Sequence, residues 1–337
     1  MIAAGAGEAL TSREIRALRG PKEAVDPWAL PPTLLEEERL PGGRGAAPSL
    51  TVFLAGAECP FTCVFCDLWR HTLDVPTPQG ALVAQLAAAL ADRAARLDLP
   101  STVVKLYNAS NFFDDRAVPP ADRRELARLL ARARKVVVEC HPRLVGPSCD
   151  EFARELGGEL EVALGLETVH PQAFARLNKG MEPAAFERAA ALLRRRGIAV
   201  RAFVQVGVPW VPAEESAEWA VRSVVHAVAA GAVHVALIPT RGGNGAMERL
   251  AERGAFAQPT LADLEEALDR ALELPEARAG SAVVTADLWD LGAVARCPAC
   301  LPARRARLHR INLAGTSEPA AGCPECGGGP AAGALGR

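Results

Sequence analysis

A repeated alternation of strand and helix patterns constrains the fold of this chain more than any other feature of its sequence. Short apolar, β-branched runs alternate with helical patterns from about residue 50 to residue 274. The expected strands are Thr51–Ala55, Thr102–Leu106, Lys135–Cys140, Leu160–Leu164, Ala199–Val206 and Val233–Ile238. The expected helices are Leu82–Leu97, Ala121–Ala133, Cys149–Leu156, Pro183–Arg196 and Ala213–Ala230. Strands this apolar are buried on both faces, which is typical of parallel strands flanked by helices.

Six such strand–helix units in a row predict an α/β fold, a partial (β/α)6 TIM-like barrel with its site at the carboxyl ends of the strands. An open doubly wound sheet is the alternative, because it uses the same units. A further helix, Leu261–Leu274, is expected to close the barrel, and Ser281–Thr285 predicts a short strand. Residues 1–48, with one helical pattern at Ser12–Leu18, are expected to form an extension that wraps the core or is partly mobile.

Three cysteines follow the first expected strand in one short loop. They are Cys59, Cys63 and Cys66, in the spacing C-x3-C-x2-C, with Phe65 just before the last. Thiolate sulfur binds iron–sulfur clusters and zinc well. A cubane [4Fe–4S] cluster usually takes four cysteines, so three protein ligands leave one iron with an open position. Zinc is the weaker alternative here, because structural zinc sites favour paired C-x2-C knuckles with four ligands.

This cysteine spacing, together with Phe65, resembles the radical S-adenosylmethionine (radical SAM) superfamily. The resemblance implies that the open iron binds SAM, and that reductive cleavage of SAM yields a 5′-deoxyadenosyl radical that abstracts hydrogen from a substrate. It also implies a one-electron reductant such as flavodoxin or ferredoxin. Gly165-Leu166-Glu167, followed by Asn178-Lys179-Gly180, resembles the subgroup with the elongator catalytic subunit and the archaeosine-forming radical SAM enzyme. Roughly Thr51 to Leu274 is covered by the resemblance.

Polar residues after the expected strands are the candidates for binding SAM. Asn108 and Ser110 occupy the place of the family's Gly-Gly-Glu motif, so they are assigned to the SAM amino group by position alone. Glu139 is a candidate partner for the ribose, with an ion pair to Arg143 as the alternative. The resemblance implies that Glu167 faces SAM and that the strand end at Pro239 contacts adenine through its backbone.

Substrate contacts are expected nearer the mouth of the barrel. Lys179 is a candidate for binding a carboxylate or phosphate, or else a favourable partner for a helix C-terminus. Arg201 and Gln205 alternate on one expected strand and either point into the barrel, with Arg201 also near SAM, or belong to an ion-paired or solvated face. The loop at Asn244 is expected to be flexible and to touch substrate. Trp210, Trp219 and Trp289 are expected to be packing residues.

Four more cysteines form two C-x2-C knuckles near the C-terminus. Cys297, Cys300, Cys323 and Cys326 together can complete a tetrahedral, zinc-ribbon-like site, with an auxiliary iron–sulfur cluster as the alternative. The basic run 304–310 between the knuckles either meets nucleic-acid phosphates or forms a solvated or acid-paired face. We expect an extension at 1–48, a barrel at 49–280, a metal-binding element at 281–326 and a disordered tail at 327–337.

Composition narrows the class of protein. The formal net charge of −2 over 337 residues excludes a globally basic nucleic-acid binder, although it permits a local basic patch. We find no apolar run long enough for a membrane span and no secretion signal, and seven of the nine cysteines fall in metal-like groups, so we expect a cytoplasmic protein. The substrate stays open between transfer RNA or other RNA and a small molecule or natural product. A non-catalytic metal-binding module that docks RNA or protein is the alternative of another class.

Overall fold

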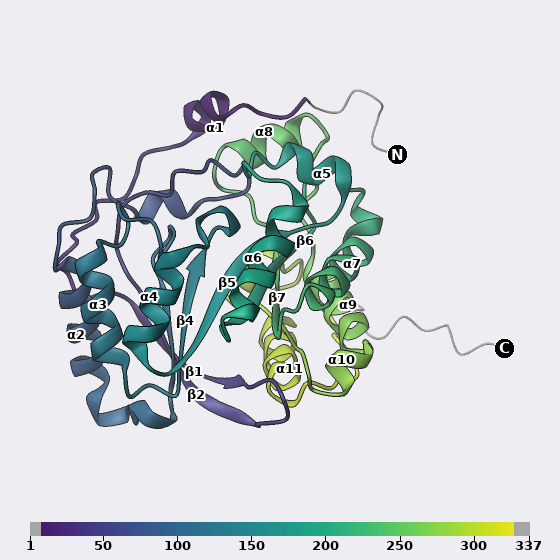
Figure 1. Ribbon diagram of the computed structural model, residues 1–337. Helices are drawn as coiled ribbons and strands as arrows, with labels where there is room; N and C mark the ends of the chain where they lie inside the picture. The colour runs from purple at the N-terminus through teal and green to yellow at the C-terminus, as the bar shows by residue number, and fades with distance from the viewer. Residues whose placement is uncertain (1–7, 327–337) are drawn as a thin grey trace.

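The strands of this protein form one sheet in the order β1 to β8, which curves into a nearly closed barrel with helices on its outer face (Figure 1). The computed structural model describes residues 8–326. The strands are β1 Thr33–Arg39, β2 Ala46–Phe53, β3 Val103–Tyr107, β4 Lys135–Cys140, β5 Glu159–Glu167, β6 Ala199–Val206, β7 His234–Pro239 and β8 Val283–Ala286. β1 is antiparallel to β2, and every later neighbouring pair is parallel.

The helices begin and end at residues that suit helix termini. They are α1 Ser12–Leu18, α2 Ala81–Arg93, α3 Pro120–Leu130, α4 Pro147–Leu156, α5 Pro171–Arg176, α6 Pro183–Arg195, α7 Ser216–Ala229, α8 Ala246–Glu252, α9 Leu261–Leu272, α10 Pro275–Arg278 and α11 Leu301–Ala314. Several start with proline, whose missing N–H has no partner in a first turn anyway. Thr260 and Asp263 form a capping box at the start of α9.

Alternation along the strands divides the apolar core into two layers. One set of strand residues, such as Val104 and Val136, packs against the helices outside the barrel. The other set faces the barrel axis, where Val103, Val137 and Ala163 form a smaller cluster. Both faces of each strand are therefore buried, as the continuous apolar runs of the sequence predict.

Charged side chains fill part of the barrel interior. Arg201 lies 2.5 Å from Glu161 and 2.7 Å from Glu38, and Lys135 lies 2.8 Å from Glu161. Lys105 binds Glu38 at 3.0 Å. All five side chains are buried, so each charge depends on its partners rather than on water. We call these five residues the barrel network.

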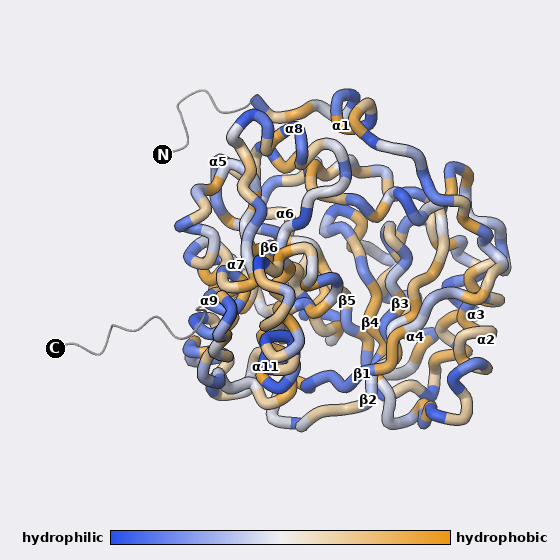
Figure 2. The backbone as a smooth tube through the Cα atoms, turned by 180° about the vertical axis from the view of Figure 1, so that it is seen from behind, coloured by the Kyte–Doolittle hydropathy of each residue, from blue (hydrophilic) through white to orange (hydrophobic). Residues whose placement is uncertain are grey.

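The prediction of a barrel rather than an open sheet is confirmed, but the expectation that Leu261–Leu274 closes the barrel is wrong. The N-terminal extension supplies β1, which pairs along its length with β2. The helix that contacts both edge strands, β1 and β8, is α11. Helix α9 instead packs outside against α7 and β8, and Figure 2 shows it beside α7. The run Thr33–Arg39 escaped prediction because its three consecutive glutamates suggest a solvent-exposed segment.

Two further observations bear on the sequence analysis. The predicted disordered tail, 327–337, lies outside the described residues. Among residues 8–326, none of the helices has the length and apolar content that crossing a bilayer requires.

Candidate active site

The three-cysteine loop follows β2 at the open end of the barrel, and asparagines from separate segments hold it there. Asn178 Nδ2 donates to the Thr62 carbonyl at 2.7 Å. Asn244 Nδ2 donates to the carbonyls of Val64 at 2.8 Å and Cys66 at 3.2 Å. The expectation that Asn244 sits in a flexible, substrate-facing loop is therefore wrong, because its side chain is buried against the cysteine loop.

The spacing of the three sulfurs distinguishes between metal centres. Within residues 8–326, two groups of three or more possible ligands have ligand atoms all within 4.8 Å of one another, and the loop cysteines belong to neither. A single tetrahedral zinc, with bonds of about 2.3 Å, holds its sulfurs roughly 3.8 Å apart. A cubane cluster binds each cysteine through a different iron and so needs wider spacing. The loop therefore fits a cluster better than one zinc ion.

The electrostatics of the loop also suit a metal centre. Desolvation raises the pKa of the Cys63 thiol to about 12, while the nearby Lys179 ammonium opposes this rise. A thiolate at such a position needs a positive partner, which a cluster supplies. Lys179 lies 2.7 Å from Glu167, and both side chains are buried. Gly165 makes room for this pair, since a Cβ there would lie 2.2 Å from Glu167 Oε1 and 2.6 Å from Lys179 Nζ.

Asn111 and His141 support the cysteine loop from β3 and β4, and the sequence analysis missed both. Asn111 Nδ2 donates to Cys59 Sγ at 3.1 Å, and its Oδ1 accepts from the His141 backbone N–H at 2.6 Å. The His141 ring stacks on Phe61 with centroids 3.7 Å apart. Its Nε2 lies 3.0 Å from the Lys179 carbonyl, while Nδ1 accepts from the Arg143 N–H. Their only signal in the sequence was their place in polar runs after strands.

His141 is neutral at physiological pH. Desolvation lowers its pKa to about 3, with the Lys179 charge acting in the same direction. The neutral ring with its proton on Nε2 satisfies both hydrogen bonds, because Nε2 then donates and Nδ1 accepts. The ring therefore ties the cysteine loop to the turn that carries Lys179.

The loop after β3 leaves buried polar atoms without partners. Both amide atoms of Asn108 and the hydroxyl of Ser110 are buried and have no hydrogen-bond partner among the described residues. Buried polar groups are nearly always paired, so such a cluster suits a bound ligand with donors and acceptors. Ala109 between them has a φ of +52°, a left-handed conformation that a non-glycine residue rarely adopts.

Glu139 is tied to this same loop. Its Oε1 accepts from the Asn108 backbone N–H at 2.7 Å. Burial raises its pKa to about 7, although the backbone N–H groups of residues 108–110 oppose the rise. The alternative ion pair with Arg143 does not form, because that guanidinium donates to the Gly180 carbonyl instead. Glu139 therefore shapes the loop that carries the unpaired Asn108.

The remaining residues that were predicted to contact SAM or substrate are buried or partly buried in contacts with other parts of the protein. Arg201 belongs to the barrel network, which matches the ion-paired alternative for this residue rather than a free substrate-facing group. Gln205 is buried and accepts from Thr240 Oγ1 at 3.2 Å. Pro239 ends β7 and is buried. Phe65 packs beside the cluster that includes Val64 and Met247.

The N-terminal helix α1 covers the cysteine loop. Ser12 Oγ accepts from Thr62 Oγ1 at 2.7 Å and from Asn178 Nδ2 at 3.0 Å. Ile15 packs with the apolar residues of α8 over the loop, and both helices lie at the same end of the barrel in Figure 1. Gly245 permits this approach, since a Cβ there would lie 1.9 Å from the Leu18 carbonyl oxygen. The extension is thus part of the site.

Comparisons with known proteins agree with this geometry. No family model matches the chain. It is 26% identical over 234 residues to archaeosine synthase subunit beta of Methanosarcina acetivorans, covering 66% of each protein. It is 21% identical over 231 residues to an uncharacterized protein of Methanocaldococcus jannaschii, covering 65% of this chain and 63% of that protein. The chain thus spans just under two thirds of the length of these curated relatives.

A solved structure shows the same fold. The archaeal Elp3 of Methanocaldococcus infernus, with an N-terminal deletion, superposes with a TM-score of 0.51 at 12% identity, covering 68% of this chain and 59% of that one. This chain shares the fold of that structure, and its cysteine motif resembles that of the radical SAM superfamily.

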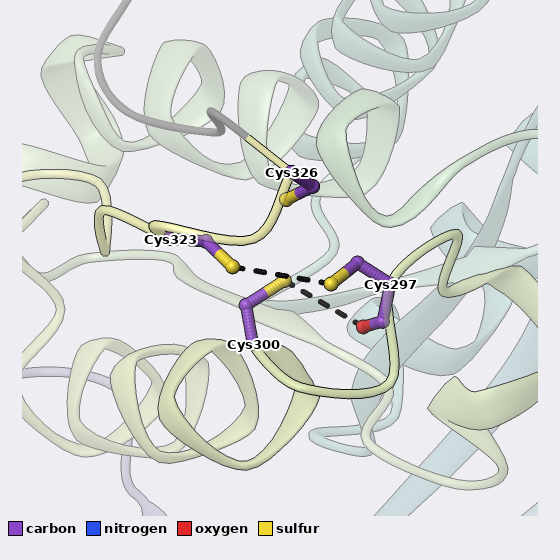
Figure 3. Close-up of side chains that lie close together, drawn as sticks. All are labelled: Cys297, Cys300, Cys323 and Cys326. Atoms are coloured by element: carbon purple, nitrogen blue, oxygen red, sulfur yellow. Dashed lines mark hydrogen bonds between the residues drawn. The ribbon is translucent and has the colours of Figure 1, made fainter.

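Outside the barrel, the four C-terminal cysteines converge on one point (Figure 3). Their sulfurs all lie within 4.8 Å of one another, and Cys297 Sγ lies 3.9 Å from Cys323 Sγ. This spacing matches the roughly 3.8 Å expected around one tetrahedral metal ion. Cys300 begins the turn into α11, so the site is joined to the helix at the barrel edge.

Most of the basic run on α11 is used inside the protein. Arg304 binds Glu265 at 2.7 Å, Arg307 binds Asp269 at 2.7 Å, and Arg310 binds Glu318 at 2.8 Å. These contacts match the acid-paired alternative of the sequence analysis. Arg305 and His309 are exposed and line a cleft of about 430 Å³ beside Leu288.

Proposed function

We propose that this chain is a radical SAM enzyme that acts on RNA. The observation that carries the proposal is the three-cysteine loop at the mouth of the barrel, whose three sulfurs do not all lie within 4.8 Å of one another. Cys59, Cys63 and Cys66 would hold a [4Fe–4S] cluster, and SAM would occupy the open iron. Together these groups supply one-electron cleavage of SAM and hydrogen abstraction from the substrate.

The chain's own residues would orient SAM and exclude water. The unpaired amide of Asn108 and hydroxyl of Ser110 offer hydrogen bonds to the polar end of SAM. Lys179 places a positive charge beside the cysteine loop, while Glu167 holds that ammonium in place. Helix α1 covers the loop and so protects it from solvent.

RNA is the substrate class that the observations favour. The relative from Methanosarcina acetivorans is named a subunit of archaeosine synthase. The cleft beside α11 leaves Arg305 available for a phosphate. Neither of these two observations requires an enclosed pocket for a small-molecule substrate.

Reductive SAM cleavage is the test of this proposal. Anaerobic reconstitution with iron and sulfide, followed by dithionite and SAM, is expected to yield 5′-deoxyadenosine and methionine. The measurement is product formation by chromatography and mass spectrometry. Tetrahedral zinc at the loop under these conditions, with no SAM cleavage, would contradict the proposal and favour a non-catalytic docking module.

Asn111→Ala is expected to loosen the cluster. The change removes the hydrogen bond to Cys59 Sγ and the contact to the His141 backbone. Loss of such a supporting contact typically lowers metal affinity about 10- to 100-fold. The measurement is iron retained during competition with a chelator. Asn312→Ala is the control, because that amide instead joins α11 to Ala286, and equal iron loss in both variants would refute the assigned role.

We further propose that the C-terminal cysteines hold zinc. Cys300→Ser is expected to release the metal and lower Tm by at least about 5 °C, since each kcal/mol shifts Tm by roughly 2–4 °C in a domain of 150–250 residues. The measurements are metal content and Tm. Arg305→Ala, an exposed change on the same helix, serves as the control and should retain both. Iron and sulfide bound there after native purification would instead indicate an auxiliary cluster.

A further inference from the structure

Trp289 presents an exposed aromatic ring at the mouth of the barrel. It follows β8, and its ring centroid lies 5.5 Å from that of Phe53, the last residue of β2, at an angle of 49°. The side chain is nevertheless 58% exposed. The expectation that Trp289 is a packing residue is therefore wrong, since more than half of its surface is open to solvent.

Two side chains hold the Trp289 backbone in place, one at its N–H group and one at its carbonyl group. Trp289 N–H donates to Asp287 Oδ1 at 3.1 Å, and Arg241 donates to the Trp289 carbonyl. Arg241 also lies 3.0 Å from Asp287. Asp290, the next residue, has a φ of +46°, a left-handed conformation that costs free energy for a non-glycine residue. Single exposed apolar side chains are common on protein surfaces, but this one has its backbone fixed and is therefore preorganised to stack a planar ligand.

The residue before Trp289 lines the cleft beside α11. Leu288, the preceding residue, lines that cleft together with Arg305 and His309. Arg305 makes no ion pair or side-chain hydrogen bond among residues 8–326, in contrast to Arg304, Arg307 and Arg310 of the same helix. Glu36 also lines the cleft, so the net positive charge of the cleft is modest. One free guanidinium is enough for one phosphate but not for a long electrostatic track.

An open ring beside one free arginine favours a polymer over a small molecule. Small ligands are usually enclosed over about 70–90% of their surface, which an outward-facing ring cannot provide. Single-stranded nucleic acids, by contrast, bind by stacking bases on exposed aromatic side chains and by placing phosphates on nearby cations.

We propose that Trp289 is a stacking platform for a base of single-stranded RNA, with a neighbouring phosphate at Arg305. This arrangement guides the strand from the α11 cleft to the barrel mouth, where Phe53 and the cysteine loop lie. The inference rests on the proposed function and names the part of the RNA that this surface recognises, an unpaired base.

The test measures RNA binding by the full-length, reconstituted protein. The probe is an unstructured RNA of about 12 nucleotides, within the usual range for single-strand sites. Trp289→Ala is expected to weaken Kd about tenfold or more, and Trp289→Phe to restore part of the loss. Trp28→Ala is the matched control, because Trp28 is similarly exposed, at 55%, but lies in the extension before β1. Arg305→Ala should weaken binding and reduce the salt slope by about one.

The outcomes separate this inference from the proposed function. Equal Kd values for Trp289→Ala and Trp28→Ala, or no RNA binding by the wild type, would overturn the platform. SAM cleavage by the wild type is measured without RNA. If the wild type cleaves SAM, the proposal that the chain is a radical SAM enzyme stands even when the stacking platform is refuted. If RNA binding depends on Trp289 but the protein does not cleave SAM, the stacking platform is supported and the proposal of a radical SAM enzyme is refuted.

Discussion

Cys63→Ala is expected to abolish both the iron–sulfur cluster and SAM cleavage while the barrel stays folded. Two remaining cysteines cannot hold a cubane that needs three protein ligands and SAM. Iron content should fall from about four per chain to background. The loop itself keeps its contacts to Asn178 and Asn244, which use Thr62, Val64 and Cys66 rather than Cys63.

The measurements are iron and sulfide content, the electron paramagnetic resonance signal of the reduced cluster, and 5′-deoxyadenosine formation. Cys149→Ala is the control, because Cys149 is buried on α4 and lies outside the loop. That variant should keep its cluster. SAM cleavage by Cys63→Ala within about tenfold of the wild type would refute the assignment of Cys63 as a ligand.

Glu161→Gln is expected to destabilise the fold by about 3–5 kcal/mol, because it removes one of the two carboxylates that neutralise a group of buried cations. Lys135 and Arg201 both bind Glu161, and their remaining contacts converge on Glu38. Glu159→Gln on the same strand is the matched control. Its carboxylate is exposed and binds Arg44 at the surface, so its loss should cost less than about 1 kcal/mol.

Denaturant unfolding of the two variants checks this difference. A Glu161→Gln variant as stable as Glu159→Gln would show that the barrel network is not maintained by this carboxylate. The pH dependence gives a second test. Burial alone would raise the pKa of Glu161, but the Arg201 and Lys135 charges lower it to about 2.

The sign of the pH effect follows from this lowered pKa. A carboxylate whose folded pKa lies below its unfolded value stabilises the protein above the unfolded pKa, and this contribution is lost as the pH falls toward about 2. The wild type should therefore lose more stability than Glu161→Gln between about pH 4.5 and 2. Equal losses of stability in the wild type and in Glu161→Gln over this pH range would contradict the lowered pKa of Glu161.

Comparison of individual strands and helices shows which of them the local sequence patterns predicted. The expected strands Lys135–Cys140 and Ala199–Val206 coincide with β4 and β6 residue for residue. Helix α11 was missed because its basic run and flanking cysteines lack the apolar periodicity that marks a helix. The short helix α5 was missed because six residues are too few to show that periodicity.

The contacts around the cysteine loop and in the barrel network could not be predicted from local sequence patterns. Asn111 lies 52 positions from Cys59 along the chain, and Arg201 lies 163 positions from Glu38, yet each pair is in contact. No short window of sequence contains both members of such a pair. The partner of each depends on which strands are neighbours and on their register.

The sequence by itself determined the strand–helix alternation, the barrel and the cysteine motif, because each is written in the spacing of nearby residues. Only the tertiary structure decided that the extension supplies an edge strand and covers the loop, that Arg201 is held in a buried network, and that Trp289 faces solvent. These outcomes depend on which distant side chains meet when the sheet curves, since burial and charge pairing are properties of the assembled barrel.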